Sequence, residues 1–221
     1  MKRTFTIASF SSCGGCKDQI TNFITDNLSG HFAYKSIRTG DEAKINIGLV
    51  EGSIAGQEDI KKLRRVRKSC EKIIAVGSCA NLGGIQSIRN ESSKKLVPKE
   101  SVYSVNKIVR VDYSIPGCPI NTQELQNCLM DLYWGKTFQL PDLAVCFECK
   151  QAGNTCFLKK NEICLGPVTR MGCKSFCISN GLSCHGCRGK IETQNTDKLE
   201  ELITSFSPEH QSSELKSIFG E

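Results

Sequence analysis

The amino-acid sequence predicts an α/β protein in which a parallel sheet wrapped by helices is followed by a small, irregular, cysteine-rich domain. Strand-like and helix-like segments alternate through the first 140 residues, and eight of the 14 cysteines lie between residues 146 and 187. The composition, 39% hydrophobic and 24% charged, is that of an ordinary globular chain. We expect the sheet domain at 1–140, the cysteine-rich domain at 141–192 and a polar C-terminal tail at 193–221, with a short helix at Leu199–Phe206.

Seven segments of the first 140 residues carry the periodicity of strands or helices. The predicted strands are Arg3–Phe10, Ala43–Val50, Lys72–Val76 and Asn106–Tyr113, and the predicted helices are Asp18–Leu28, Gln57–Ser69 and Asn121–Trp134. The last helix has Asn121 as a plausible N-cap, and leucines recur along one side of it. Strands that alternate with helices favour a mainly parallel, flavodoxin-like sheet.

The N-terminal residues do not read as a targeting segment. The start, MKRTFTIASFSSC, has a basic tip and a short apolar stretch, but polar residues alternate there as in a strand and no cleavage pattern follows. The longest apolar run is far shorter than the roughly 20 residues of a transmembrane helix. We therefore expect a cytoplasmic protein without a membrane span.

The cysteine content is the strongest signal in the composition. Fourteen cysteines in an exported chain would indicate a disulfide framework, but this chain has no export signal, is long enough to bury a core and carries its cysteines in close pairs. Such a pattern favours metal binding. The formal charge of +6 fits that interpretation, because three iron–sulfur cubanes held by four thiolates each would bring it to about zero.

Four cysteines of the first domain are expected to meet at one edge of the sheet. Cys13-Gly-Gly-Cys16 lies where the first strand turns into the first helix, and Cys79 and Cys118 each follow a later strand. The carboxyl ends of parallel strands form the crevice where such sheets bind ligands, and a helix N-terminus stabilises negative charge. A dithiol oxidoreductase would need only two cysteines. Zinc remains the alternative metal for a site with four cysteine ligands.

The second domain holds eight cysteines, opened and closed by CxxC pairs, which fit two four-cysteine centres. Iron–sulfur clusters and paired zinc sites both suit this spacing. The region has few hydrophobic residues, so a bound group is expected to organise it. A basic run at 61–68 is either a solvated helix face or a docking surface for an acidic partner.

With these motifs, the chain resembles the small subunit of nickel–iron hydrogenases. The resemblance is to the cytoplasmic multimeric branch: sulfhydrogenase delta subunits, and gamma subunits of archaeal hydrogenases that do or do not reduce the deazaflavin coenzyme. It covers roughly residues 4 to 190. The markers are Cys13-Gly-Gly-Cys16, Val50-Glu51-Gly52-Ser53-Ile54, Gly77-Ser-Cys79-Ala, Val111-Asp-Tyr-Ser-Ile-Pro-Gly-Cys118-Pro, Cys164-Leu-Gly-Pro-Val-Thr-Arg170 and Ser183-Cys184-His-Gly-Cys187.

The resemblance implies three 4Fe–4S clusters in a line, each with four cysteine ligands. The proximal set is Cys13, Cys16, Cys79 and Cys118; the medial set is Cys173, Cys177, Cys184 and Cys187; the distal set is Cys146, Cys149, Cys156 and Cys164. In periplasmic relatives a histidine replaces the first distal cysteine, and the medial site often has only three cysteines. Cys177 therefore looks like a fourth ligand that gives a cubane of lower potential.

Several residues fall outside the three sets or depart from the family pattern. Cys70 and Cys128 lie in helical stretches and are expected to be small buried hydrophobic residues. Glu51 is either a structural carboxylate or a polar neighbour of the proximal cluster that assists proton traffic or contacts the large subunit. Ile120 stands where the family usually has a second proline after the last proximal cysteine. The homologous subunit of respiratory complex I is disfavoured, because its cluster uses adjacent cysteines.

The resemblance implies a hydrogenase subunit that contains no catalytic site of its own. The expected function is to carry electrons from the nickel–iron centre of a large subunit through three clusters to a flavin or iron–sulfur partner. One alternative is an electron-transfer subunit of a related complex whose large subunit has lost its nickel site. The other is a zinc-binding module that contacts nucleic acid through the basic helix.

Overall fold

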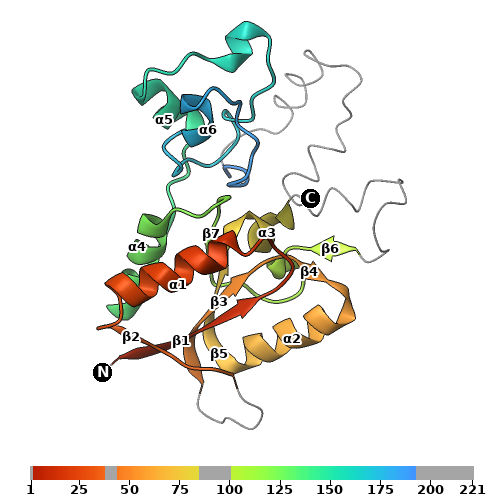
Figure 1. Ribbon diagram of the computed structural model, residues 1–221, viewed down its shortest axis with the longest axis vertical. Coiled ribbons are helices and arrows are strands. Elements are labelled where there is room, and N and C mark those ends of the chain that lie inside the picture. The colour runs from red at the N-terminus through yellow and green to blue at the C-terminus, as the bar shows by residue number, and fades with distance from the viewer. Residues whose placement is uncertain (1, 38–43, 85–100, 193–221) are drawn as a thin grey trace. The chain divides into compact units, whose positions relative to one another are not determined.

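The computed structural model describes residues 2–37, 44–84 and 101–192 of the 221-residue chain. The chain divides into two compact units, Met1–Gln139 and Leu140–Phe219 (Figure 1). The division predicted from sequence lies after residue 140. The predicted helix at Leu199–Phe206 and the tail that contains it lie outside the described residues.

The first unit is built on a five-stranded parallel sheet of order β2-β1-β3-β5-β7. Numbered along the sheet's own strands, this is the flavodoxin-like order 2-1-3-4-5, so the predicted fold class is confirmed. The strands are β1 (Arg3–Ser9), β2 (Phe32–Tyr34), β3 (Ile45–Glu51), β5 (Cys70–Val76) and β7 (Tyr113–Ile115). Two short strands, β4 (Ile54–Ala55) and β6 (Val102–Tyr103), pair separately and antiparallel.

Helices cover both faces of this sheet (Figure 1). Apolar side chains of α1 and α4 pack on one face, and those of α2 and α3 pack on the other. The helices are α1 (Gly15–Asn27), α2 (Gly56–Ser69), α3 (Gly77–Leu82) and α4 (Thr122–Tyr133). The predicted cap of α4 is confirmed, since the Asn121 side chain accepts a hydrogen bond from the Gln123 amide at 2.9 Å.

The strand predicted at Asn106–Tyr113 is wrong. Val105–Lys107 forms a short 3₁₀-helix, and β7 begins only at Tyr113. The reason lies in Asp112, whose backbone amide donates to the Ile73 carbonyl while its own carboxylate accepts the Ile73 amide at 2.8 Å. This side-chain bridge ties the incoming loop to β5, so regular pairing starts one residue later.

Asp112 also anchors the end of α2 in a half-buried ion pair. Arg67 donates to its carboxylate at 2.6 Å and to the Cys70 and Glu71 carbonyls at 2.9 and 2.7 Å. Burial favours the neutral acid, but the bonds from Ile73 and Arg67 outweigh it and hold the Asp112 pKa below its usual value. The carboxylate therefore contributes stability above its unfolded pKa of about 3.9 and loses it as the pH falls through the folded pKa.

We expect Asp112→Asn to lower the free energy of unfolding by about 2 to 3 kcal/mol at pH 7, because it removes a charge-assisted network. Urea unfolding at neutral pH and again near pH 3 measures this, and the difference between wild type and variant should shrink in acid. Glu58→Gln is the control, since Glu58 pairs with Lys61 in solvent. An equal loss in both variants would contradict the assignment.

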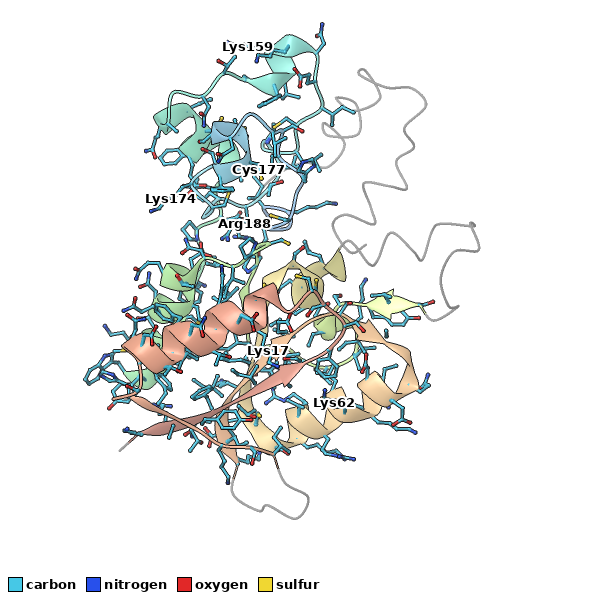
Figure 2. The ribbon with its side chains drawn as sticks, in the orientation of Figure 1. Lys17, Lys62, Lys159, Lys174, Cys177 and Arg188 are labelled. Carbon is cyan, nitrogen blue, oxygen red and sulfur yellow. The ribbon has the colours of Figure 1, made fainter. Side chains whose placement is uncertain are left out.

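The basic run lies on α2, whose buried side carries Leu63 and Val66. Four of its cationic residues are exposed on the opposite side, and a fifth, Lys62, donates to the Ser9 carbonyl at 2.7 Å and lies over the Phe10 ring. Figure 2 shows Lys62 on this helix. This exposed basic face fits both expectations, a solvated helix face and a docking surface for an acidic partner.

The second unit has a small core in which cysteines take a large share. Its elements are α5 (Val145–Gln151), η3 (Phe157–Lys160) and α6 (Phe176–Ser179). Its buried cluster consists of Val145, Cys149, Phe157, Cys164, Leu165, Val168, Ile178 and Cys184. Three of these eight residues are cysteines, so the apolar core alone is small. None of the described helices is long and apolar enough to cross a membrane.

Candidate metal centres

The proximal set comes from loops and helix starts that follow three different strands. Cys13 follows β1 and Cys16 lies in the first turn of α1; Cys79 lies in α3, directly after β5; Cys118 follows β7. All four are therefore at the carboxyl edge of the parallel sheet, where the topology rule predicts a ligand site.

The four proximal thiols interact electrostatically with one another. Burial raises the pKa of Cys16 to about 11, and Cys118 and Cys79 add to the shift. Burial likewise raises the pKa of Cys79 to about 11, with Cys118 and Cys13 among the further causes. Since like charges disfavour ionisation, the four sulfurs form one electrostatic group. A bound cation would reverse this effect and favour the thiolates.

Two glycines let the backbone approach the proximal sulfurs closely. A Cβ atom on Gly77 would lie 2.8 Å from the Cys16 sulfur, and one on Gly84 would lie 2.7 Å from the Cys79 sulfur. Both glycines have positive φ, at +85° and +66°. Any side chain there would meet both a sulfur atom and an unfavourable backbone conformation.

Glu51 lies beside the proximal set. It is the last residue of β3, only 2% exposed, and its Oε2 atom has no hydrogen-bond partner within the described residues. Its charge contributes to the raised pKa of both Cys16 and Cys79. A buried carboxyl group without a partner is costly, so Glu51 stands out from an ordinary structural carboxylate.

The distal set is gathered in the same way. Burial raises the pKa of Cys146 to about 11, and Cys164, Cys149 and Cys156 add to the shift. The Asn154 side chain donates a hydrogen bond to Cys149. Gly166 lies close to two of these sulfurs. A Cβ atom on it would lie 3.4 Å from the Cys146 sulfur and 3.5 Å from the Cys164 sulfur.

Cys184 is the buried thiol of the medial set. Burial raises the pKa of Cys184 to about 12; its sulfur accepts a hydrogen bond from the Gly186 amide and interacts with Cys187. Cys173 packs against the same buried cluster. Cys177 makes its hydrogen bonds through its carbonyl, which accepts from Asn180 and Leu182. The described contacts therefore join Cys184 with Cys187.

The distal and medial sets touch. The Cys184 amide donates to the Cys164 sulfur at 3.4 Å, and Cys164 adds to the raised pKa of Cys184. Within the described residues, no three cysteine, histidine or carboxylate side chains are placed so as to hold a single metal ion.

The two remaining cysteines are small buried residues of the hydrophobic clusters, as expected, but the helical stretch predicted at Cys70 is wrong, because Cys70 is the first residue of β5. Cys70 is 1% exposed and packs against Gly48, whose hypothetical Cβ atom would lie 2.8 Å from its sulfur. Cys128 is fully buried on α4. Burial raises the pKa of both thiols, to about 11 and about 12. His185, inside the last CxxC, is exposed.

Two charged residues near the medial set were not found from sequence. Glu148 lies inside the first CxxC of the second domain, and Arg188 follows the last one. Each interacts electrostatically with Cys173. Their positions between or beside cysteines are a signal, but sequence alone does not indicate which sulfur they face.

The chain matches a family model described as the 20 kDa subunit of NADH ubiquinone oxidoreductase, over residues 13–132. The delta subunit of sulfhydrogenase 2 from Pyrococcus furiosus is 33% identical to it, over 93% of this chain and 94% of the relative. A vhu subunit of the F420-non-reducing hydrogenase from Methanocaldococcus jannaschii is 28% identical, over 67% of this chain and 66% of the relative.

Solved structures agree with these relatives. A chain of an NAD+-reducing nickel–iron hydrogenase in the H2-reduced state has 25% identity and a TM-score of 0.54, covering 64% of this chain and 96% of that one. An actinobacterial-type hydrogenase from Ralstonia eutropha H16 shares the fold, with a TM-score of 0.63 over 96% of this chain and 92% of that one at 14% identity.

The sheet, its cysteine-lined edge and these matches define the class: the chain belongs to the 20 kDa subunit family shared by complex I and hydrogenases. Within that family it is of the nickel–iron hydrogenase small-subunit type, and its role is that of an oxidoreductase subunit. The resemblance stated from sequence is confirmed.

Proposed function

We propose that this chain is the electron-transfer small subunit of a nickel–iron hydrogenase and that it holds three 4Fe–4S clusters. The main supporting observation is the proximal set, in which thiols from three separate strand ends interact at one edge of the sheet. Four thiolates are the donor set that such a cluster requires. When bound, each cluster would accept and release one electron.

The side chains of this chain supply ligation, burial and hydrogen bonding. Cys13, Cys16, Cys79 and Cys118 would hold the proximal cluster; Cys173, Cys177, Cys184 and Cys187 the medial one; Cys146, Cys149, Cys156 and Cys164 the distal one. Burial and backbone amides directed at sulfur set the potentials of such clusters. The sheet unit would thus carry the proximal site, and the unit that begins at Leu140 the other two.

The partners follow from this role. A large subunit with the nickel–iron centre would deliver electrons to the proximal set, and a flavin or iron–sulfur subunit would receive them from the distal set. Both sulfhydrogenase and F420-non-reducing hydrogenase relatives are named as subunits of larger enzymes. We propose that the complex is cytoplasmic, because cysteines in close pairs that suit metal binding are typical of chains in a reducing compartment.

The test is the metal content of the complex purified without oxygen. We expect about twelve irons and twelve sulfides per chain and a broad absorbance near 400 nm, on the count of three cubanes. Cys79→Ser should remove about four irons, whereas Cys70→Ala, the control in the apolar core, should remove none. Zinc without sulfide would refute the proposal. A large subunit that lacks its two terminal CxxC pairs would point to the related complex without nickel.

The Glu51 carboxylate is expected to lower the reduction potential of the proximal cluster. Adding an electron beside a buried negative charge is unfavourable, so Glu51→Gln should raise the midpoint potential. Redox titration followed by electron paramagnetic resonance measures it. Glu58→Gln on the solvated face of α2 is the matched control and should leave the potential unchanged. An unchanged potential in Glu51→Gln would contradict this effect of Glu51 on the cluster.

A further inference from the structure

Cys173 has a carboxylate and a guanidinium acting on its sulfur. The Oε2 atom of Glu148 lies 4.0 Å from its sulfur and also accepts the Gly172 amide at 3.1 Å. Arg188 acts on the same thiol with the opposite sign: Glu148 raises the pKa of Cys173 and Arg188 lowers it, both after the larger effect of burial. The electrostatic environment of this sulfur is therefore a balance of two named groups.

The cation of this pair is held inside the protein. Arg188 is only 3% exposed, and its Nε atom donates to the Met171 carbonyl at 2.8 Å and to the Arg170 carbonyl at 3.2 Å. Both carbonyls belong to the segment that leads into Cys173. Since a buried guanidinium stays ionised, its charge acts at low effective dielectric and with little screening by salt.

The backbone after Cys173 is also arranged around the sulfur. Lys174 and Ser175 have φ of +54° and +50°, a left-handed conformation that is unfavourable for residues other than glycine. This turn directs the amides of Phe176 and Ser175 to the Cys173 sulfur. Ser175 is 1% exposed, and its hydroxyl accepts from Asn154 at 3.1 Å, so the turn is fixed by its surroundings.

We propose that Arg188 and Glu148 form an opposed pair of positioning charges that sets the reduction potential of the cluster ligated by Cys173. Arg188 raises that potential and Glu148 lowers it. This inference rests on the proposed function, because it requires a redox group at Cys173. Neither residue is a ligand; each acts through the field that it places at the sulfur.

The charge balance of the redox step gives the direction. One electron from the preceding cluster enters the site, and a four-thiolate cubane goes from a total charge of about −2 to about −3, with no bond made or broken and no proton taken up. The more negative state is stabilised by a nearby fixed cation and destabilised by a nearby carboxylate. Removing Arg188 therefore makes reduction harder, and removing Glu148 makes it easier.

The experiment is a redox titration of the intact complex, followed by electron paramagnetic resonance. Arg188→Gln should lower the midpoint potential of one cluster, and Glu148→Gln should raise the potential of the same cluster. Lys174→Gln is the matched control: it also removes one positive charge, one residue from Cys173, but Lys174 is exposed at the surface (Figure 2). Lys174→Gln should shift the midpoint potential of this cluster much less than Arg188→Gln does. Arg188→Lys keeps the charge and should restore most of the wild-type potential.

Each outcome separates the two proposals. A wild-type complex without cluster signals overturns the proposed function and the inference together. A wild-type complex with normal signals, whose potentials stay unchanged in both Arg188→Gln and Glu148→Gln, overturns the inference alone. Equal shifts in Arg188→Gln and Lys174→Gln also overturn it. If the Arg188→Gln complex fails to assemble, Glu148→Gln tests the inference by itself. An upward shift in its midpoint potential supports the inference, and an unchanged potential overturns it.

Discussion

Replacing Gly77 with alanine is expected to abolish the proximal cluster while the sheet remains folded. The new methyl group would lie 2.8 Å from the Cys16 sulfur, well inside ordinary contact distance, and φ of +85° disfavours any side chain. The Cys16 thiol would have to move, and a four-thiolate site with one displaced ligand loses its metal. Iron analysis should show a loss of about four irons per chain.

The control for this substitution separates the sulfur contact from backbone strain. Gly135 has a similar φ of +75°, but a Cβ atom there would meet nothing within 4 Å. Gly135→Ala should therefore cost the strain alone and keep the full iron content. If Gly77→Ala keeps its iron, or if both variants lose it equally, the close approach at Cys16 has no part in the site.

Removal of iron and sulfide is expected to unfold the second unit and spare the first. The described core of the second unit has eight buried residues, three of them candidate ligands, whereas the sheet unit buries fifteen and eleven residues on its two faces. A small core gains little from burial, and a bound metal group then supplies much of the folding free energy.

Hydrogen exchange measured by mass spectrometry distinguishes the units. In the stripped complex, the amides of Val145 and Ile191, which bond to Thr169 and Val168 in the folded unit, should exchange far faster than in the loaded complex. Amides of β3 and β5, at the centre of the sheet, serve as the internal control and should stay protected. Unchanged protection at Val145 would show that the unit folds on its apolar core alone.

The fold was predictable because its main elements carry strong periodicity. Both α2 and α4 have one apolar side, and β5 ends in the apolar run Ile-Ile-Ala-Val. The short elements escaped prediction: β2 has three residues and α3 has six, too few to show a period. The misplaced strand at Asn106–Tyr113 failed for a tertiary reason, because the Asp112 side chain takes over a backbone partner of β5.

The candidate site was predictable to the extent that topology rules apply to it. Cys79 and Cys118 could be assigned to one edge because parallel strands end together. No such rule applies to the irregular second domain, so the pairing of Cys184 with Cys164 across 20 residues could not be read from spacing. The opposed charges at Cys173 are likewise a product of folding, since Glu148 and Arg188 lie 40 residues apart in the chain.

The hydrogen bond from the Cys184 amide to the Cys164 sulfur has a consequence for the two clusters proposed in the second unit. A single peptide N–H joins a ligand of one set to a ligand of the other, and the two thiols already sense each other's charge. Negative charge added at one set must then oppose its addition at the neighbouring set. With the proposed clusters bound, electron occupancy would be anticooperative: an electron on one cluster would disfavour a second electron on the neighbouring cluster.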